Sequence, residues 1–129
     1  MEVEIIRSLD YEFFHVALRA DNLVRIVVKT NDTVEIDLAK EIEDAVDKVR
    51  GGSKIALLIL ANEWSMVSME TRTYLANRQN PDKIAEAYIV KSLAQKLMGN
   101  VYLSFNKPIY PTKIFTDEEL AITWLKTKF

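Results

Sequence analysis

The amino-acid sequence predicts an α/β fold with a mixed β-sheet whose central strands are parallel. The chain opens with two segments in which apolar and other residues alternate, as in a half-buried hairpin. An uninterrupted apolar run at residues 55–61 then indicates a strand that is covered on both faces. Strand-like and helical patterns alternate from there to the end of the chain, so helices are expected to pack against the sheet. The predicted order is β-β-α-β-α-β-α-β-α.

The predicted hairpin consists of strands at residues 12–19 and 23–29. In each strand every second residue is apolar, so one face of the hairpin is expected to be buried. The connecting residues, Ala20-Asp21-Asn22, include types that tolerate a left-handed backbone, and they favour a tight turn.

The first predicted helix begins at Asp37, which is expected to cap it, and ends at Gly51 and Gly52. Its apolar residues recur at helical spacing at Leu38, Ile42, Ala45, Val46 and Val49. The strand at 55–61 follows and is predicted to form the centre of the sheet.

Two further β-α units are predicted after the central strand. Ser68 is expected to cap a short helix that runs to about Asn77, and residues 84–90 form the next buried strand. Ser92 and Gln95 form a capping box, which begins a third helix. Its inward face is predicted to consist of Leu93, Ala94, Leu97, Met98, Val101 and Phe105. Within that helix Gly99 is expected to cost about 1 kcal/mol relative to alanine.

The carboxyl-terminal segment is predicted to contain a strand at 113–115 and a last helix. A second capping box, Thr116 with Glu119, marks the start of that helix, and Phe115 with Leu120 is expected to form a hydrophobic staple. The side chains predicted to face inward are Leu120, Ala121, Trp124 and Leu125.

The composition is that of one globular domain spanning residues 1–129. Hydrophobic residues make up 49% of the chain and charged residues 28%, which is typical of proteins that bury a core. A formal net charge of −2 gives no general attraction for nucleic acid, so no nucleic-acid partner is expected. The lack of cysteine fits a cytoplasmic location. The chain has no apolar run long enough to cross a bilayer, so no integral membrane association is expected.

The carboxyl-terminal half of the sequence resembles a family of small bacterial STAS-like, or SpoIIAA-like, proteins. The most specific part of the likeness is the pattern Pro-x-x-x-Phe-Thr-Asp-Glu-Glu-x-Ala-x-x-Trp-Leu, which begins at Pro111. The segments 85–90 and 106–108 add to it, and the likeness covers about residues 12–127. The resemblance implies the STAS fold, which is the fold of sulfate-transporter tails and anti-sigma-factor antagonists. Antagonists of this type are binding modules that phosphorylation controls.

The resemblance also implies a phosphoacceptor serine at the start of the helix after the central strand, where this chain has Ser68. A phosphate there would meet unpaired backbone N–H groups and change a docking surface. The preceding residue is Val67, whereas the family pattern has aspartate. The alternative role for Ser68 is ordinary helix capping. Ser65, in the preceding loop, is a secondary candidate.

The loop before Ser68 carries large apolar side chains at the carboxyl end of the central strand. The candidate partner-contact residues are Trp64, Met66, Val67, Met69 and Arg72. Apolar loop residues mark contact surfaces, and ligands of open α/β sheets collect at this end of the strands. The alternative is that these side chains fold under the loop and seal the core.

The sequence contains no set of residues typical of an enzyme. His15 is the only histidine, and no acid or serine is arranged near it in the sequence to orient it as a base. One imidazole and scattered carboxylates do not predict a metal site, and the three glycines form no phosphate-binding loop. We therefore expect no catalytic residues, no cofactor and no bound metal.

Two functions of different classes are consistent with these patterns. The first is a non-enzymatic protein-interaction or regulatory module, switched by phosphorylation, that binds a protein partner or a second copy of itself. The second is a carrier of a small molecule or lipid that uses an apolar pocket near residues 62–69.

Overall fold

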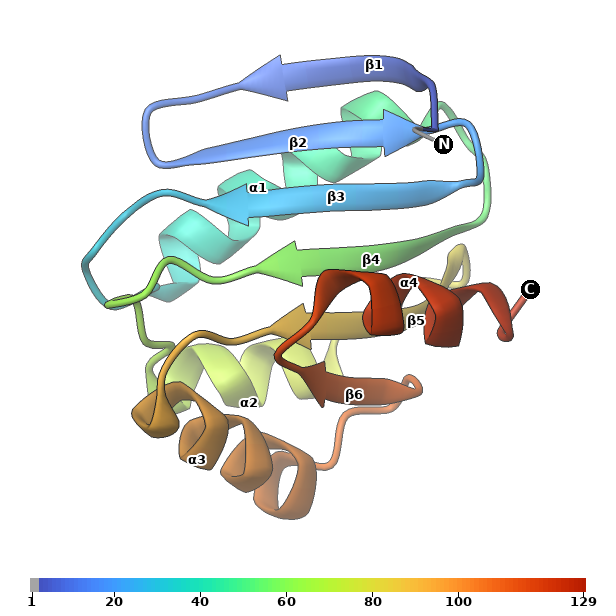
Figure 1. Ribbon diagram of the computed structural model, residues 1–129. Helices are drawn as coiled ribbons and strands as arrows, with labels where there is room; N and C mark the ends of the chain where they lie inside the picture. Colours follow the sequence, from blue (N-terminus) through green and yellow to red (C-terminus); the bar gives the residue numbers. More distant parts are fainter. Residues whose placement is uncertain (1–2) are drawn as a thin grey trace.

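The computed structural model describes residues 3–129, which form a six-stranded sheet in the order β1-β2-β3-β4-β5-β6 (Figure 1). The strands are β1 (Ile5–Asp10), β2 (Phe14–Arg19), β3 (Leu23–Val28), β4 (Ile55–Leu60), β5 (Lys83–Ile89) and β6 (Thr112–Phe115). The helices are α1 (Ile36–Arg50), α2 (Met69–Asn77), α3 (Leu93–Val101) and α4 (Glu118–Lys126), and the π-helical segment η1 (Tyr102–Asn106) continues α3.

The sheet is antiparallel from β1 to β3 and parallel from β3 to β6. The predicted α/β class and the mixed sheet with parallel strands in its centre are therefore confirmed. Strand β4 lies between β3 and β5, and its apolar side chains belong to clusters on both faces of the sheet, as the apolar run at 55–61 predicts.

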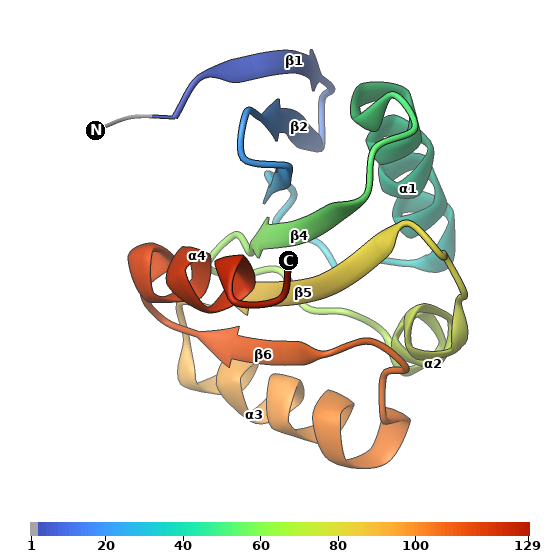
Figure 2. The ribbon, with the colours of Figure 1, turned by 90° about the vertical axis from the view of Figure 1, so that its right-hand side faces the viewer.

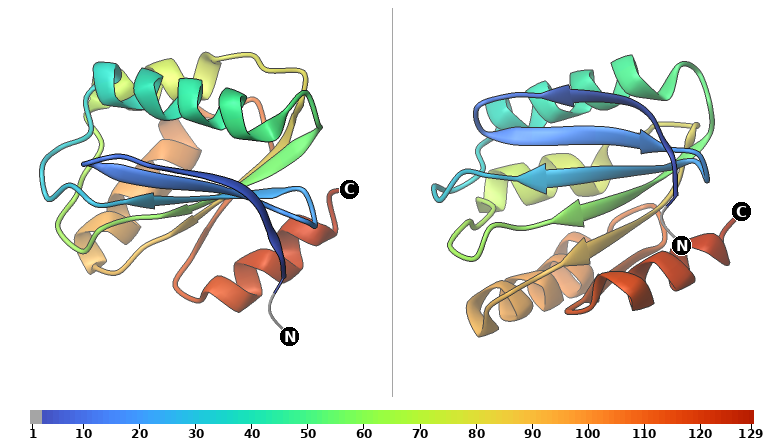
Figure 3. Two further views of the ribbon diagram at one scale, coloured as in Figure 1. Left: turned by 90° about the horizontal axis from the view of Figure 1, so that it is seen from above. Right: turned by 45° about the horizontal axis from the view of Figure 1, so that its top comes forward.

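The helices form one layer on each face of the sheet. Helices α1 and α2 lie on one face and α4 lies on the other, as the view along the sheet shows (Figure 3). Helix α3 follows α2 along the first face, toward the β6 edge (Figure 2). Each of α1, α2 and α3 joins neighbouring parallel strands, and right-handed crossovers that advance in one direction place all their helices on the same side.

The core is divided by the sheet into two parts. On the α1 side, alternate residues of the hairpin strands pack against the helix, and this cluster contains Phe14, Val16, Leu18, Val24, Ile26, Ala45, Val46, Val49 and Ile55. On the α4 side the cluster contains Leu23, Ala56, Leu58, Ala85, Ala87, Ile89, Ala121, Ile122 and Leu125. The predicted hairpin is confirmed, and its turn residue Asn22 has a φ of 65°.

Strand β1 is an element that the sequence analysis missed. It pairs antiparallel with β2 at the edge of the sheet. Most of its residues are exposed, including Ile5 at 48% and Ile6 at 46%. Because an edge strand can be held mainly by backbone pairing, β1 shows no regular apolar alternation that would have predicted it.

Three details at helix starts were predicted wrongly. The N-cap of α1 is Glu35, without a side-chain capping bond, so Asp37 lies in the first turn. The N-cap of α4 is Asp117, whose carboxylate accepts from the backbone N–H of Leu120 at 3.1 Å, in place of Thr116. Leu120 is 63% exposed, contrary to the prediction that it faces inward. Gly51, by contrast, ends α1 with a left-handed backbone, as expected.

Candidate functional site

The loop that follows β4, residues 61–68, is built from short-range hydrogen bonds. The side chain of Asn62 accepts from the backbone N–H of Trp64 at 3.0 Å, and Ser65 Oγ donates to the Asn62 carbonyl at 3.1 Å. Farther along, Val67 forms an isolated parallel bridge with Val34, just before α1. These contacts fix the direction in which the loop enters α2.

The five candidate contact residues divide into two groups. Trp64 is 69% exposed and Met69 is 67% exposed, so both are available to a partner. Met66 and Val67 are half-buried, and the backbone N–H of Val67 points at Met98 Sδ at 3.2 Å. Arg72 is also half-buried, because its guanidinium donates to the Val67 carbonyl. Trp64 and Met69 thus face outward, whereas Val67 packs against the core cluster near α1, so each alternative applies to part of the loop.

Ser68 caps α2. Its Oγ accepts from the backbone N–H of Thr71 at 3.2 Å and lies 2.8 Å from Thr71 Oγ1. Phosphorylation of Ser68 stays a prediction. Ser65 is 4% exposed, which places it out of reach of a modifying enzyme in this conformation.

Helix α3 turns a row of apolar side chains outward, contrary to the prediction that they face the core. Their exposed fractions are 72% for Leu93, 56% for Leu97, 40% for Val101 and 82% for Phe105. The four residues follow one another at steps of four, so they form one ridge along α3 and η1. We call these four residues the α3 ridge. At about 1.5 Å per residue, it is about 18 Å long.

The inner face of α3 consists of residues that the apolar pattern did not select. Gln95 is 1% exposed, and its amide nitrogen donates to the carbonyls of Asn62 and Ser65, the latter at 2.8 Å. Gly99 lies so close to β6 that an added Cβ would be 3.0 Å from two side-chain carbons of Ile114. Polar anchoring and close approach therefore decide which face of α3 is buried.

The segment that carries the α3 ridge contains basic residues but no acidic ones. From Lys91 to Thr116 the chain contains four lysines, at 91, 96, 107 and 113, and no aspartate or glutamate. All four lysines are exposed. Lys91, Lys96 and Lys107 thus lie on or next to the segment that carries the apolar row, although the whole chain has a net charge of −2. Lys113 lies on β6 with its Nζ over the Phe115 ring, on the α4 side of the sheet.

The predicted cap of α3 at Ser92 is confirmed, whereas the Gln95 side chain binds the backbone of Lys91 in place of Ser92. Ser92 Oγ accepts from the backbone N–H of Gln95 at 3.2 Å, and Gln95 Oε1 accepts from the backbone N–H of Lys91 at 2.8 Å. Gln95 is therefore both a capping residue and the anchor of the loop after β4. This second role was missed because it depends on the loop and the helix being adjacent in space, which the sequence alone does not reveal.

His15 has one acidic neighbour that the sequence analysis did not foresee. Its Nδ1 lies 2.9 Å from Asp10 Oδ1, because the pairing of β1 with β2 places the two residues opposite each other. Asp10 also binds Lys29 Nζ at 2.5 Å. The side-chain hydrogen bond from Lys29, followed by that from His15, lowers the pKa of the Asp10 carboxyl. Across residues 3–129, no three histidine, aspartate or glutamate side chains cluster where they could hold a metal ion.

None of the helices in the described part of the chain has the length and apolar character that crossing a bilayer requires.

Comparison with known proteins supports the fold. A family model for a domain of unknown function, DUF7793, matches residues 16–128. Among solved structures, the chain is similar to an uncharacterized protein of the DUF3478 family with a SpoIIAA-like fold, from Shewanella loihica PV-4. The two are 16% identical, with a TM-score of 0.51, over 96% of this chain and 92% of that one. The SpoIIAA-like fold that the resemblance implied is thereby confirmed. No curated protein matches the chain.

Proposed function

The chain belongs to the DUF7793 family and has a SpoIIAA-like fold, and from that premise we propose that it is a non-enzymatic, cytoplasmic protein-interaction module. Its docking surface is the α3 ridge, with Trp64 and Met69 as further contacts. The observation that carries this proposal is the outward orientation of four large apolar side chains on one helix. Exposed apolar rows of this kind mark contact surfaces, because burying them in a complex removes apolar area from water.

The partner that fits this surface is an amphipathic helix or extended segment rich in aspartate and glutamate. Its apolar side chains would cover Leu93, Leu97 and Phe105, and its carboxylates would face Lys91, Lys96 and Lys107. Complementary charge of this kind raises the rate of association and selects against basic partners. Binding is therefore expected to weaken as the salt concentration rises.

Phosphorylation of Ser68 is the proposed control of this module. Ser68 caps α2, and the guanidinium of Arg72 is held at the carbonyl of the preceding residue, Val67. A phosphate on Ser68 would place negative charge at a helix N-terminus and beside this arginine. That new charge would alter the surface next to Met69, which is 67% exposed.

The test uses capture of partners from a native lysate with quantitative comparison between variants. Leu97→Asp and Phe105→Asp each place a carboxylate on the α3 ridge and are expected to lose the proteins that the unmodified chain retains. Leu120→Asp is the matched control, because Leu120 is 63% exposed but lies on α4, on the other face of the sheet. Trp64→Ala and Ser68→Asp then test the additional contact and the switch.

An unchanged set of captured proteins in both ridge variants would contradict the proposal. Light scattering of the same variants separates a heterologous partner from self-association. A dimer of the unmodified chain that Leu97→Asp converts to a 14.8 kDa monomer would make the α3 ridge a homodimer interface instead.

A further inference from the structure

A cavity of about 110 Å³ lies between α1, α2 and the sheet, away from the α3 ridge. Most of its wall is apolar and comes from both helices and from β3 and β4, including Ile26, Ala39, Ile42, Leu57, Ile59 and Leu75. The cavity is partly open to solvent, so a small molecule can enter it.

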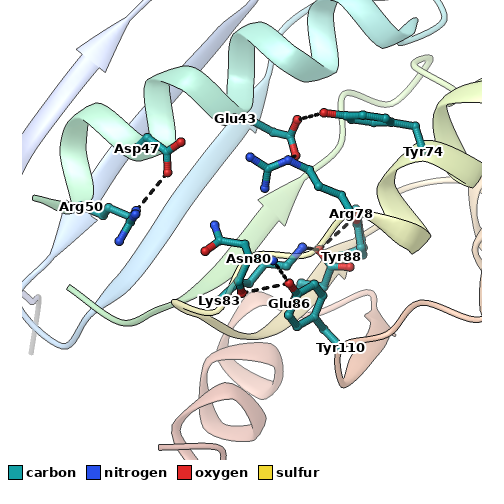
Figure 4. A network of polar contacts seen from close by, with 10 residues as sticks. All are labelled: Glu43, Asp47, Arg50, Tyr74, Arg78, Asn80, Lys83, Glu86, Tyr88 and Tyr110. Carbon is teal, nitrogen blue, oxygen red and sulfur yellow. Dashed lines mark hydrogen bonds and ion pairs between the residues drawn. The ribbon is translucent and has the colours of Figure 1, made fainter. Parts of the chain in front are cut away.

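One end of the cavity is polar and contains charged side chains from α1, from β5 and from Arg78, which directly follows α2 (Figure 4). Lys83 and Glu86 form an ion pair at 3.2 Å, and their side chains are only 7% and 3% exposed. Glu43 pairs with Arg78 and accepts a hydrogen bond from the Tyr74 hydroxyl at 2.7 Å. Burying a charged pair costs more free energy than burying an apolar pair of the same size. The presence of the Lys83–Glu86 pair at a cavity therefore calls for an explanation.

The ammonium group of Lys83 has donor capacity that the protein does not use. A lysine ammonium has three N–H donors. Within residues 3–129, Glu86 Oε2 is the oxygen acceptor that Nζ reaches, and the centre of the Tyr110 ring lies 4.2 Å away. Because Lys83 lines the cavity and is 8% exposed, a molecule inside the cavity can supply a further acceptor.

The carboxylates that line the cavity are already paired with cations. Each lining carboxylate has a cation beside it: Glu43 has Arg78, Glu86 has Lys83, and Asp47 has Arg50 at 3.0 Å. An ion in the cavity would leave one buried charge without compensation. The site therefore favours an uncharged occupant.

We propose that this cavity is a binding site for a compact, uncharged molecule that is mainly apolar and carries one hydroxyl or carbonyl oxygen. The oxygen accepts a hydrogen bond from Lys83, and the rest of the molecule packs against Ile42, Leu57 and Leu75. A closed apolar cavity of about 150 Å³ takes up benzene. The present cavity is smaller but partly open to solvent, so a molecule with a single ring can occupy it with one end at the opening. Phenol has this size and chemistry and serves as the probe.

The experiment is a titration of the isotope-labelled protein with phenol, followed by amide proton–nitrogen correlation spectra. Saturable shifts are expected for amides around the cavity, including those of Ile42, Leu57 and Leu75. Toluene, which has the same ring without the oxygen, is expected to bind about tenfold or more weakly, since a hydrogen bond from a charged donor is lost. Benzoate, which carries a charge, is expected to cause no saturable shift.

Two variants locate the binding site. Ala39→Leu fills the cavity from α1 and is expected to abolish the phenol shifts, whereas Ala94→Leu makes the same change at an exposed position of α3 and leaves them intact. Ile42→Phe is the second filling variant if Ala39→Leu fails to give a folded spectrum. The proposal is overturned if phenol causes no saturable shift in the unmodified protein, or if a folded filling variant binds phenol equally well. Equal binding of toluene and phenol would overturn the role of Lys83.

Discussion

Helices α3 and α4 are each nine residues long and begin at a capping side chain, but they use their apolar residues in opposite ways. Helix α4 buries Ala121, Ile122 and Leu125 in the core cluster beneath it. Helix α3 buries Gln95 and Gly99 and leaves Leu93, Leu97 and Val101 exposed, with Met98 half-buried. The apolar side chains of α4 hold it to the sheet, whereas α3 is held by hydrogen bonds and by close contact.

Apolar spacing thus predicts an amphipathic helix without predicting which surface its apolar face meets. For α4 that surface is the adjoining sheet. For α3 the polar anchor Gln95 decides the orientation, and the α3 ridge is left without a covering surface within residues 3–129. A ridge that the fold does not need for its own stability is available for a partner. Truncating apolar side chains of α3 should therefore lower the free energy of unfolding less than truncating those of α4.

The largest expected effect is the contrast between Leu125→Ala and Leu97→Ala. Leu125 is fully buried, so its truncation should lower the free energy of unfolding by about 3 kcal/mol. Leu97 is 56% exposed, and the same substitution there should change it by less than about 0.5 kcal/mol. Urea unfolding followed by circular dichroism measures both. Comparable losses would show that the α3 ridge packs within the chain.

Gly99→Val tests the close contact that replaces apolar packing under α3. The new side chain would collide with Ile114, since its Cβ alone would lie 3.0 Å from that residue's Cδ1 and Cγ1. We expect unfolding free energy to fall by about 2 kcal/mol. Asn100→Val, at the exposed neighbouring position, is the control. In the double variant with Ile114→Ala, part of the stability lost through Gly99→Val should be restored, because the colliding side chain is removed. If the losses in unfolding free energy of the two single variants simply add, the contact is contradicted.

Gln95→Ala tests the polar anchor itself. It removes the hydrogen bonds that Gln95 donates to the Asn62 and Ser65 carbonyls and the one that it accepts from the Lys91 backbone N–H. The expected loss is about 1.5 kcal/mol, because the carbonyl of buried Ser65 loses its hydrogen bond. Amide hydrogen exchange should rise in residues 62–68 before it rises elsewhere, whereas exposed Lys96→Ala should leave it unchanged. Equal protection of the amides of residues 62–68 in the Gln95→Ala and Lys96→Ala variants would mean that another contact holds the loop.

The smallest expected effect concerns ion pairs at the ends of α4. Glu118 pairs with Arg25 at 2.8 Å, and Lys126 pairs with Asp21 at 3.5 Å. Burial alone would raise the pKa of the Asp21 carboxyl, but hydrogen bonds and charge from Arg19, with the charge of Lys126, lower the pKa overall. A carboxyl whose pKa is lowered by folding stabilises the protein when ionised, and this contribution disappears as the pH falls through the folded-state pKa.

Asp21→Asn is therefore expected to lose less stability than the unmodified chain as the pH falls below about 4. The difference in unfolding free energy should be less than about 1 kcal/mol, because the ion pairs are partly exposed. Thermal unfolding measured from pH 7 to pH 3 provides the curve. If the stability of the variant falls as steeply with decreasing pH as that of the unmodified chain, Asp21 does not contribute to the acid sensitivity.

The sequence was sufficient to predict the elements whose formation depends on local pattern. The apolar run at 55–61, the hairpin around Asn22, the end of α1 at Gly51 and the capping box at Ser92 all correspond to observed structure. Each of these features depends on residues that are close together in the chain. Local backbone preference and side-chain capping are therefore enough to reveal them.

The features that could not be predicted depend on contacts between distant segments. Strand β1 is held by pairing with β2, and the buried face of α3 is set by the loop after β4 and by Ile114. Of the candidate contact residues, Trp64 and Met69 face outward, but the α3 ridge and the cavity were missed. A cavity is formed by side chains from several elements, so no single stretch of sequence carries its pattern.

The strand order of the sheet also bears on how the chain assembles. Every strand after the first pairs with the strand that immediately precedes it in the sequence. A nascent polypeptide leaving the ribosome can therefore extend the sheet one β-α unit at a time, and no later strand has to be inserted between two that have already paired. Until β6 and α4 emerge, β5 is the unpaired edge of the sheet. The face of β5 that carries Ala85 and Ala87, which α4 later covers, is then exposed to water.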